Sequence, residues 1–191
     1  MDIHRTGLRN YLLNLHLDDA VMDHLMVCFH IRRYRKNEYF AFAGERADKL
    51  GFLVSGLFFM HTLRENGTVF VKDFMVNDQF ILASFDPKQE AGVCIQALKD
   101  SILLESKYSD VQSVFKRYPD LGMLAKRGME KRFESLCGRL ESFAGMQAKE
   151  RYDIFKQTYG MIEEEIPQHL IASYIGITPT QLSRIRKHKI F

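Results

Sequence analysis

The last part of the chain carries small, glycine and apolar residues at the spacings that two crossed helices with a tight turn between them require. Counted from Gln168, such a helix-turn-helix needs a small residue at the fifth position, glycine at the ninth, and apolar residues at set positions around them. The sequence supplies the full set, which is Ile171, Ala172, Ile175, Gly176, Ile177, Leu182 and Ile185. The pattern predicts two short helices joined by a sharp turn.

Each of these residue types has a physical cause. Ala172 is small because the second helix crosses close to the first at that point. Gly176 permits the left-handed backbone conformation that ends the first helix and turns the chain sharply. Pro167 suits the first turn of the first helix, and Thr178 followed by Pro179 caps and opens the second.

The outer face of the second helix carries polar and cationic side chains and no acid. Arg184 can bond the O6 and N7 atoms of guanine, Gln181 can bond an adenine edge, and Lys187 and the hydroxyls can hold phosphates. The residues that we expect to contact DNA are Gln168, His169, Thr178, Thr180, Gln181, Ser183, Arg184 and Lys187. The alternative is a helix-turn-helix that serves only as a packing unit.

The front of the chain has two different periods. The first 30 residues indicate helix, with Asp18 as an N-cap and apolar residues at three- and four-residue spacing. From about Tyr34 short apolar runs alternate with turn signals, and Asn66-Gly67 predicts a hairpin with a type I′ turn. Many short strands at this spacing indicate a sandwich or jelly-roll barrel.

Helical periodicity returns after Ser106, with a short helix over about residues 110–117 and a long one over about residues 120–144. Along the long helix, apolar residues are spaced four, three, four and three apart, as on one side of a coiled coil. This seam consists of Met129, Phe133, Leu136, Leu140 and Phe143. The seam predicts a homodimer interface; the alternative is that it packs on the chain's own β domain.

Composition and motif searches exclude other classes. The 191 residues are 46% hydrophobic and have a formal net charge of +3, with four cations and no acid over residues 184–189. Three scattered cysteines indicate neither a disulfide framework nor a metal site. We find no catalytic motif, no signal peptide and no apolar run that could span a bilayer, and we expect a cytoplasmic protein that is not an enzyme.

Residues 166–187 closely resemble the DNA-binding helices of the Crp/Fnr superfamily of bacterial transcription regulators. Three front segments resemble its cyclic-nucleotide-binding jelly roll, namely Ala43-Gly44-Glu45, Leu53-Val54-Ser55-Gly56 and Ile95-Gln96-Ala97-Leu98. The resemblance implies an α+β chain: a double-stranded β-helix (jelly roll) over residues 1–118, a dimerisation helix over 119–146, and a helix-turn-helix domain without a full wing over 147–191. It also implies a pseudo-palindromic double-stranded DNA site, RNA polymerase and a small-molecule effector as partners.

The chain departs from the family where a cyclic nucleotide's phosphate would be bound. Leu82-Ala83 and Ala91-Gly92 stand where members that bind cyclic AMP have a Gly-Glu pair and an arginine followed by a hydroxyl residue. Without those charge-assisted hydrogen bonds we expect no cyclic AMP binding, unless the cluster at residues 88–90 (Lys-Gln-Glu) has taken over the phosphate.

Other sensing chemistries have no matching pattern in the sequence. An iron-sulfur cluster needs grouped cysteines, and none of the seven histidines stands in a haem-ligand pattern, so we expect no cofactor. The phenylalanines at 58, 59, 70, 74, 80 and 85 either line a cavity for an apolar effector or fill the core. A regulatory module that binds a protein partner through its β domain remains the alternative function.

Overall fold

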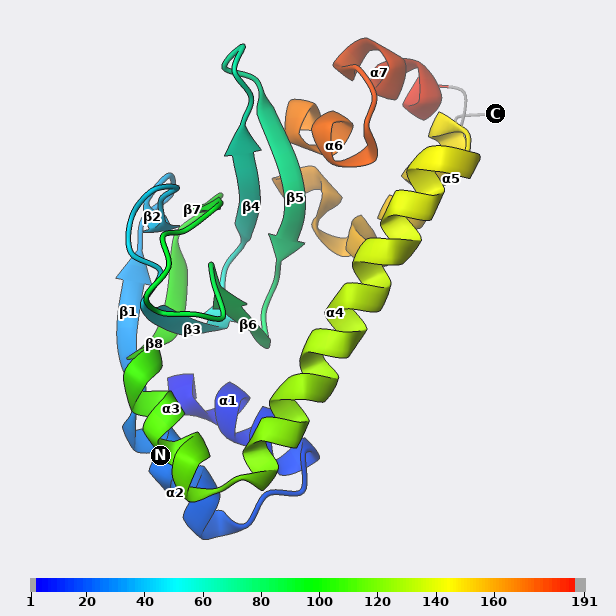
Figure 1. The fold of residues 1–191 in the computed structure, drawn as a ribbon. Coiled ribbons are helices and arrows are strands. Elements are labelled where there is room, and N and C mark those ends of the chain that lie inside the picture. Colours follow the sequence, from blue (N-terminus) through cyan, green and yellow to red (C-terminus); the bar gives the residue numbers. More distant parts are fainter. Residues whose placement is uncertain (1–2, 188–191) are drawn as a thin grey trace. The chain divides into compact units, whose positions relative to one another are not determined.

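The computed structural model describes residues 3–187 and divides them into two compact units (Figure 1). The first unit runs up to Thr62 and resumes over Asp73–Lys126. The second unit combines Leu63–Lys72 with the chain from Arg127 onward. The predicted domain boundaries after residues 118 and 146 fall next to the ends of two helices, α3 at Arg117 and α4 at Gly145.

Two antiparallel sheets form the β-roll, and their residues belong to the first unit except where β4 and β5 enter the segment Leu63–Lys72 of the second. One has the order β1 (His30–Tyr34), β8 (Ser101–Lys107), β3 (Lys49–Ser55), β6 (Gln79–Leu82). The other has the order β2 (Tyr39–Ala41), β7 (Cys94–Ala97), β4 (Phe58–Leu63), β5 (Val69–Met75). The buried side chains of Leu53, Phe58, Ile95 and Leu103 belong to one core cluster drawn from both sheets. The predicted jelly roll is confirmed.

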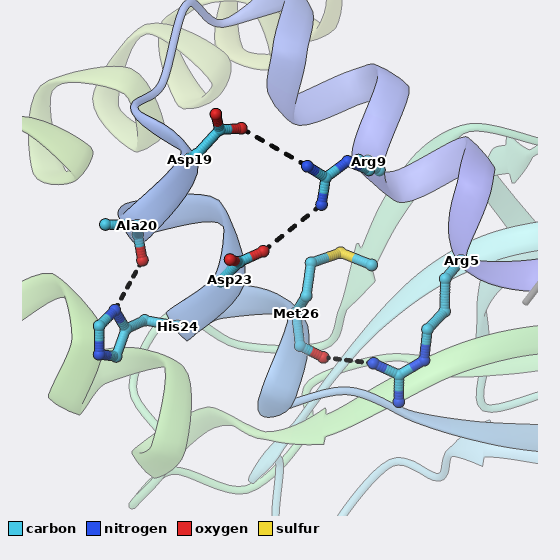
Figure 2. A network of polar contacts seen from close by, with 7 residues as sticks. All are labelled: Arg5, Arg9, Asp19, Ala20, Asp23, His24 and Met26. Carbon is cyan, nitrogen blue, oxygen red and sulfur yellow. Dashed lines mark hydrogen bonds and ion pairs between the residues drawn. The ribbon is translucent and has the colours of Figure 1, made fainter. Parts of the chain in front are cut away.

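Three helices gather at one end of this roll in Figure 1: α1 (Ile3–Asn14), α2 (Asp19–Val27) and α3 (Tyr108–Arg117). Their apolar faces share a second core cluster with Phe52 and Leu104. Polar contacts between α1 and α2 are drawn in Figure 2. Arg5 donates to the carbonyl of Met26 at 3.0 Å, and Arg9 pairs with Asp19 and Asp23. The predicted helical start of the chain is confirmed up to Val27, and Asp18 occupies the N-cap position of α2, but its side chain makes no capping hydrogen bond.

The hairpin predicted around Asn66-Gly67 joins β4 to β5, but its turn is not type I′. That turn type needs positive φ at both central residues, and Gly67 has φ +76 while Asn66 is not among the described residues with positive φ. The Asn66 side chain instead accepts hydrogen bonds from the backbone N–H and the hydroxyl of Thr68. With these two local bonds Asn66 does not adopt positive φ, and Gly67 alone takes the left-handed conformation in this turn.

The second unit contains the helical end of the chain. Its helices are α4 (Asp120–Gly145), of which the unit holds the part from Arg127, α5 (Ala148–Tyr159), the 3₁₀ helix η1 (Gly160–Glu165), α6 (Gln168–Ile175) and α7 (Pro179–Lys187). The predicted long helix is therefore confirmed. Within residues 3–187, no helix has the length and apolar character needed to cross a membrane.

Candidate DNA-binding site

The turn between α6 and α7 depends on Gly176 for two reasons. Its φ of +72 and ψ of 41 lie in the left-handed region, which side chains with a Cβ adopt at a cost. A Cβ at this position would also lie 2.7 Å from a ring carbon of Phe143. The turn is closed by the N–H of Ile177, which donates to the carbonyl of Ala172 at 2.9 Å. The glycine assignment from the sequence is confirmed.

The inner faces of α6 and α7 form a small core. Ile171, Ala172 and Leu182 have no exposed side-chain surface, and Ile175 is nearly as buried. Ile177 is half-buried, as is Ile185 in the next turn of α7. Because the apolar positions are filled as the motif requires, both helices are held by packing and the outer face of α7 is free for other contacts.

The start of α7 uses a reciprocal cap. The Thr178 hydroxyl accepts a hydrogen bond from the N–H of Gln181 at 3.2 Å, and the Gln181 side-chain oxygen accepts one from the N–H of Thr178 at 2.9 Å. Pro179 begins the helix as predicted, whereas Pro167 occupies the N-cap position of α6 rather than its first turn. Bidentate adenine recognition would compete for the same Gln181 oxygen.

The residues predicted to contact DNA lie at the start of α6 and along α7. Thr180, Arg184 and Lys187 are exposed, and Ser183 is half-buried. Gln168 and His169 are exposed in the first turn of α6. Among the described residues, Arg184 and Lys187 have no side-chain partner. Two cations on an acid-free face are therefore available to a polyanion.

Arg186 differs from its cationic neighbours because it is bound within the unit. Its Nη2 lies 2.5 Å from a carboxylate oxygen of Glu163, and its Nε donates to the Tyr152 hydroxyl at 3.1 Å. The Tyr152 hydroxyl donates to the same Glu163 oxygen at 2.5 Å. Burial first, and then this hydrogen bond, raise the pKa of Tyr152, so the phenol stays protonated as a donor.

The end of the β4–β5 hairpin is attached to α6 by side chains that the sequence analysis did not single out. The Ser173 hydroxyl donates to the carbonyl of Val69 at 2.8 Å and accepts from the N–H of Val71 at 3.0 Å. Arg139 on α4 donates to the carbonyls of Val71, at 2.9 Å, and Tyr174, at 2.7 Å. No local periodicity marks such contacts, because the partners are far apart in sequence.

Four of the five predicted seam residues on α4 form an exposed stripe, with exposed fractions of 42% for Met129, 68% for Phe133, 54% for Leu136 and 68% for Leu140. Phe143 is different, since its ring is half-buried beside Gly176 and lies 5.3 Å from the Arg139 guanidinium. The structure therefore gives Phe143 a packing role within its own chain.

The roll has no side-chain cation or hydroxyl at residues 82–83 and 91–92. Ala91 is buried, and its backbone pairs with the 44–45 segment: its N–H donates to the carbonyl of Glu45 at 2.7 Å. The alternative cluster at residues 88–90 lines a surface pocket of about 440 Å³ together with Gly44 and Arg46. Arg46 is itself engaged there, donating to the carbonyl of Pro87 at 3.3 Å.

The six phenylalanines considered for an effector cavity are mostly core residues. Phe58, Phe59 and Phe74 are buried, and Phe70 and Phe80 are half-buried. Phe80 packs edge-on against Phe52, with ring centroids 5.1 Å apart. Phe85 is exposed. This arrangement favours the reading in which these rings fill the interior.

This architecture is similar to that of several known proteins. The family model for the cyclic nucleotide-binding domain matches residues 31–118. The structure of FixK2 from Bradyrhizobium japonicum has a TM-score of 0.75 and 16% identity, with 84% of this chain and 83% of that chain covered. The c-di-GMP responsive regulator CLP from Xanthomonas campestris has a TM-score of 0.70 and 16% identity, covering 90% and 91%.

A protein from Eubacterium rectale that is assigned to the Crp/Fnr family of transcriptional regulators has a TM-score of 0.71 and 16% identity, with 94% of this chain and 87% of that chain covered. No curated protein sequence matches the chain. At these identities the solved structures establish the fold alone. Over residues 31–118 the chain is similar to the cyclic nucleotide-binding domain family, and as a whole it has the fold of the Crp/Fnr transcription regulators.

Proposed function

We propose that this chain is a sequence-specific DNA-binding transcription regulator of the Crp/Fnr type that acts in the cytoplasm. The observation that carries the proposal is the outer face of α7, where Arg184 and Lys187 are exposed and have no side-chain partner in the described chain. The apolar inner faces of α6 and α7 hold the two helices together, so the side chains on this outer face are not needed for packing. Thr180 and Ser183 add hydroxyl donors beside the two cations.

The stripe Met129, Phe133, Leu136 and Leu140 supports a homodimer. Large apolar side chains repeated on one side of a long helix are stabilised when a second copy covers them. A two-fold dimer would present two copies of α7, about 34 Å apart for half-sites one helical turn apart. The DNA site is then a pseudo-palindrome.

For the sensor-like roll we propose an effector other than cyclic AMP, because residues 82–83 and 91–92 offer a phosphate no side-chain donor or charge. The surface pocket beside Arg46 is open and polar, and its cation is already engaged. RNA polymerase is the expected protein partner of the DNA-bound dimer.

The test is selection of bound sequences from random double-stranded DNA, followed by titration of the selected site and a shuffled version at several salt concentrations. We expect a two-fold related site, preference over the shuffled DNA, and affinity that falls steeply with salt. Equal affinity for both DNAs, or none for either, would favour the alternative regulatory module that binds a protein partner.

A further inference from the structure

We infer that Glu163 is a positioning residue for the recognition helix α7: by holding Arg186 against Tyr152, it fixes the angle at which Arg184 meets DNA and so sets sequence specificity. This inference rests on the proposed DNA-binding function. It concerns Glu163 and Tyr152, two residues outside the helix-turn-helix motif.

The contacts of Glu163 are those of a fixed group. Its side chain is 12% exposed, one carboxylate oxygen receives bonds from both Arg186 and Tyr152, and the other lies 4.0 Å from the Lys156 ammonium. Tyr152 is buried, and the Arg186 side chain is 26% exposed. Charge-assisted hydrogen bonds at such sites are stronger than those between neutral groups.

Helix α7 needs an anchor of this kind. It has nine residues, a length at which a helix has little stability of its own, so its orientation depends on what it packs against. Its apolar anchor is Leu182, and Arg186 follows four residues later on the same face. The Thr178–Gln181 cap fixes the start of the helix, and the Arg186–Glu163 pair fixes its last turn.

The two glutamates that follow Glu163 make it possible to separate the effect of its position from the effect of a negative charge in the same segment. Glu163, Glu164 and Glu165 are consecutive, but Glu163 alone of the three is half-buried and the other two are exposed. Among the described residues, Glu164 has no side-chain partner. Glu164→Gln therefore removes the same charge from the same short segment without touching Arg186, and it is the matched control.

The experiment compares wild type, Glu163→Gln and Glu164→Gln as full chains, each titrated with the selected site and with shuffled DNA. We expect Glu163→Gln to lower affinity for the selected site about tenfold more than Glu164→Gln does, the loss of one charge-assisted hydrogen bond. Affinity for shuffled DNA should change equally in both variants, because phosphate contacts tolerate a small rotation of α7. Arg186→Gln should lower the ratio of selected-site to shuffled-DNA affinity as much as Glu163→Gln does, and the double variant should lower that ratio no further, although loss of the Arg186 charge also weakens binding to both DNAs.

If Glu163→Gln and Glu164→Gln lowered affinity for the selected site equally, Glu163 would act only through its negative charge, and the inference would be overturned. Equal losses on selected and shuffled DNA in Glu163→Gln would overturn it as well, since that pattern signifies a less stable domain. Amide exchange along α7 supplies a second readout: it should accelerate in Glu163→Gln and stay unchanged in Glu164→Gln. Wild-type chain without sequence preference refutes the proposed function itself, and unchanged exchange in Glu163→Gln refutes the positioning role.

Discussion

The helix-turn-helix and the β-roll differ in how fully they match the pattern of the family that the chain resembles. In α6 and α7 the packing positions and the outward polar positions are both filled by suitable residues. The roll keeps its strands and core, but the places expected to bind a phosphate hold Leu82-Ala83 and Ala91-Gly92. In this chain the strands and core of the roll are therefore present without the side chains expected to bind a phosphate.

The physical reason is visible at Ala91. Its backbone forms a pair of hydrogen bonds with the 44–45 segment, and its small methyl side chain is buried. Leu182, by contrast, is both fully buried and part of the helix that carries Arg184. The roll is thus held at this point by backbone bonds that require no ligand-binding side chain, whereas the outer face of α7 depends on the packed face of the same helix.

The largest effect is expected from charges in the exposed stripe of α4. Leu136→Asp combined with Leu140→Asp should give a monomer by sedimentation and abolish specific DNA binding, since an unpaired charge is strongly disfavoured in an apolar interface. Ser135→Asp with Gly138→Asp adds the same charge at exposed positions outside the stripe and should leave the dimer intact. A folded, dimeric stripe variant would place the interface elsewhere.

Next in size is the contribution of Arg184. Arg184→Ala should weaken binding to the selected site by about 1–3 kcal/mol and relax the preference at one base position. Lys187→Ala should weaken binding to selected and shuffled DNA alike, because phosphate contacts carry no sequence information. Fluorescence anisotropy with both DNAs measures the difference, and an unchanged specific affinity in Arg184→Ala would refute its base contact.

A smaller effect is expected on stability at the turn. Gly176→Ala should lower the free energy of unfolding by about 1–2 kcal/mol from the left-handed backbone alone, and the contact with Phe143 adds to this. Gly160→Ala is the control, because that glycine has φ −57 and open space around its Cβ position. Thermal denaturation should separate the two, and equal midpoints would contradict the account of the turn.

In the roll, pH should have a modest effect through His61. This residue is 3% exposed, stacks on Phe59 with ring centroids 4.4 Å apart, and has no hydrogen bond to Nδ1 within the described residues. Burial lowers its pKa below the usual 6.5, so the unfolded chain binds the proton more readily. The resulting stability is present above pH 6.5 and is lost as pH falls, by at most about 1.4 kcal/mol per pH unit. In urea titrations His61→Phe should remove this dependence, and an unaltered slope would refute it.

The smallest expected signal is that of cyclic AMP. Calorimetry should detect no saturable binding up to about 100 μM nucleotide, a concentration that corresponds to roughly 5–6 kcal/mol of binding free energy. The same titration of a known cyclic AMP-binding member of the family provides the positive control. Submicromolar binding would show that the roll does have residues that bind the nucleotide. The cluster at residues 88–90 would then be the first candidate for the phosphate contact.

The sequence was sufficient to predict features set by local chemistry. Periodicity located the long helix and the two short ones, and the need for positive φ identified Gly176. It did not distinguish Phe143 from the other seam residues, because a heptad pattern cannot tell which apolar side chain packs against the chain's own turn. The ion pair between Glu163 and Arg186 was not predicted for a related reason, since two residues 23 positions apart leave no periodic signal.

The hairpin contacts of α6 have a consequence for how this helix-turn-helix could be moved between proteins. The compact unit that contains it is interrupted in sequence, because Leu63–Lys72 comes from the middle of the strand-rich region. A gene fragment that begins at Arg127 would leave Ser173 without its partners on Val69 and Val71, and Arg139 without the carbonyls of Val71 and Lys72. A recombination event that transfers only the contiguous C-terminal segment would therefore separate these helices from part of the contacts that hold them.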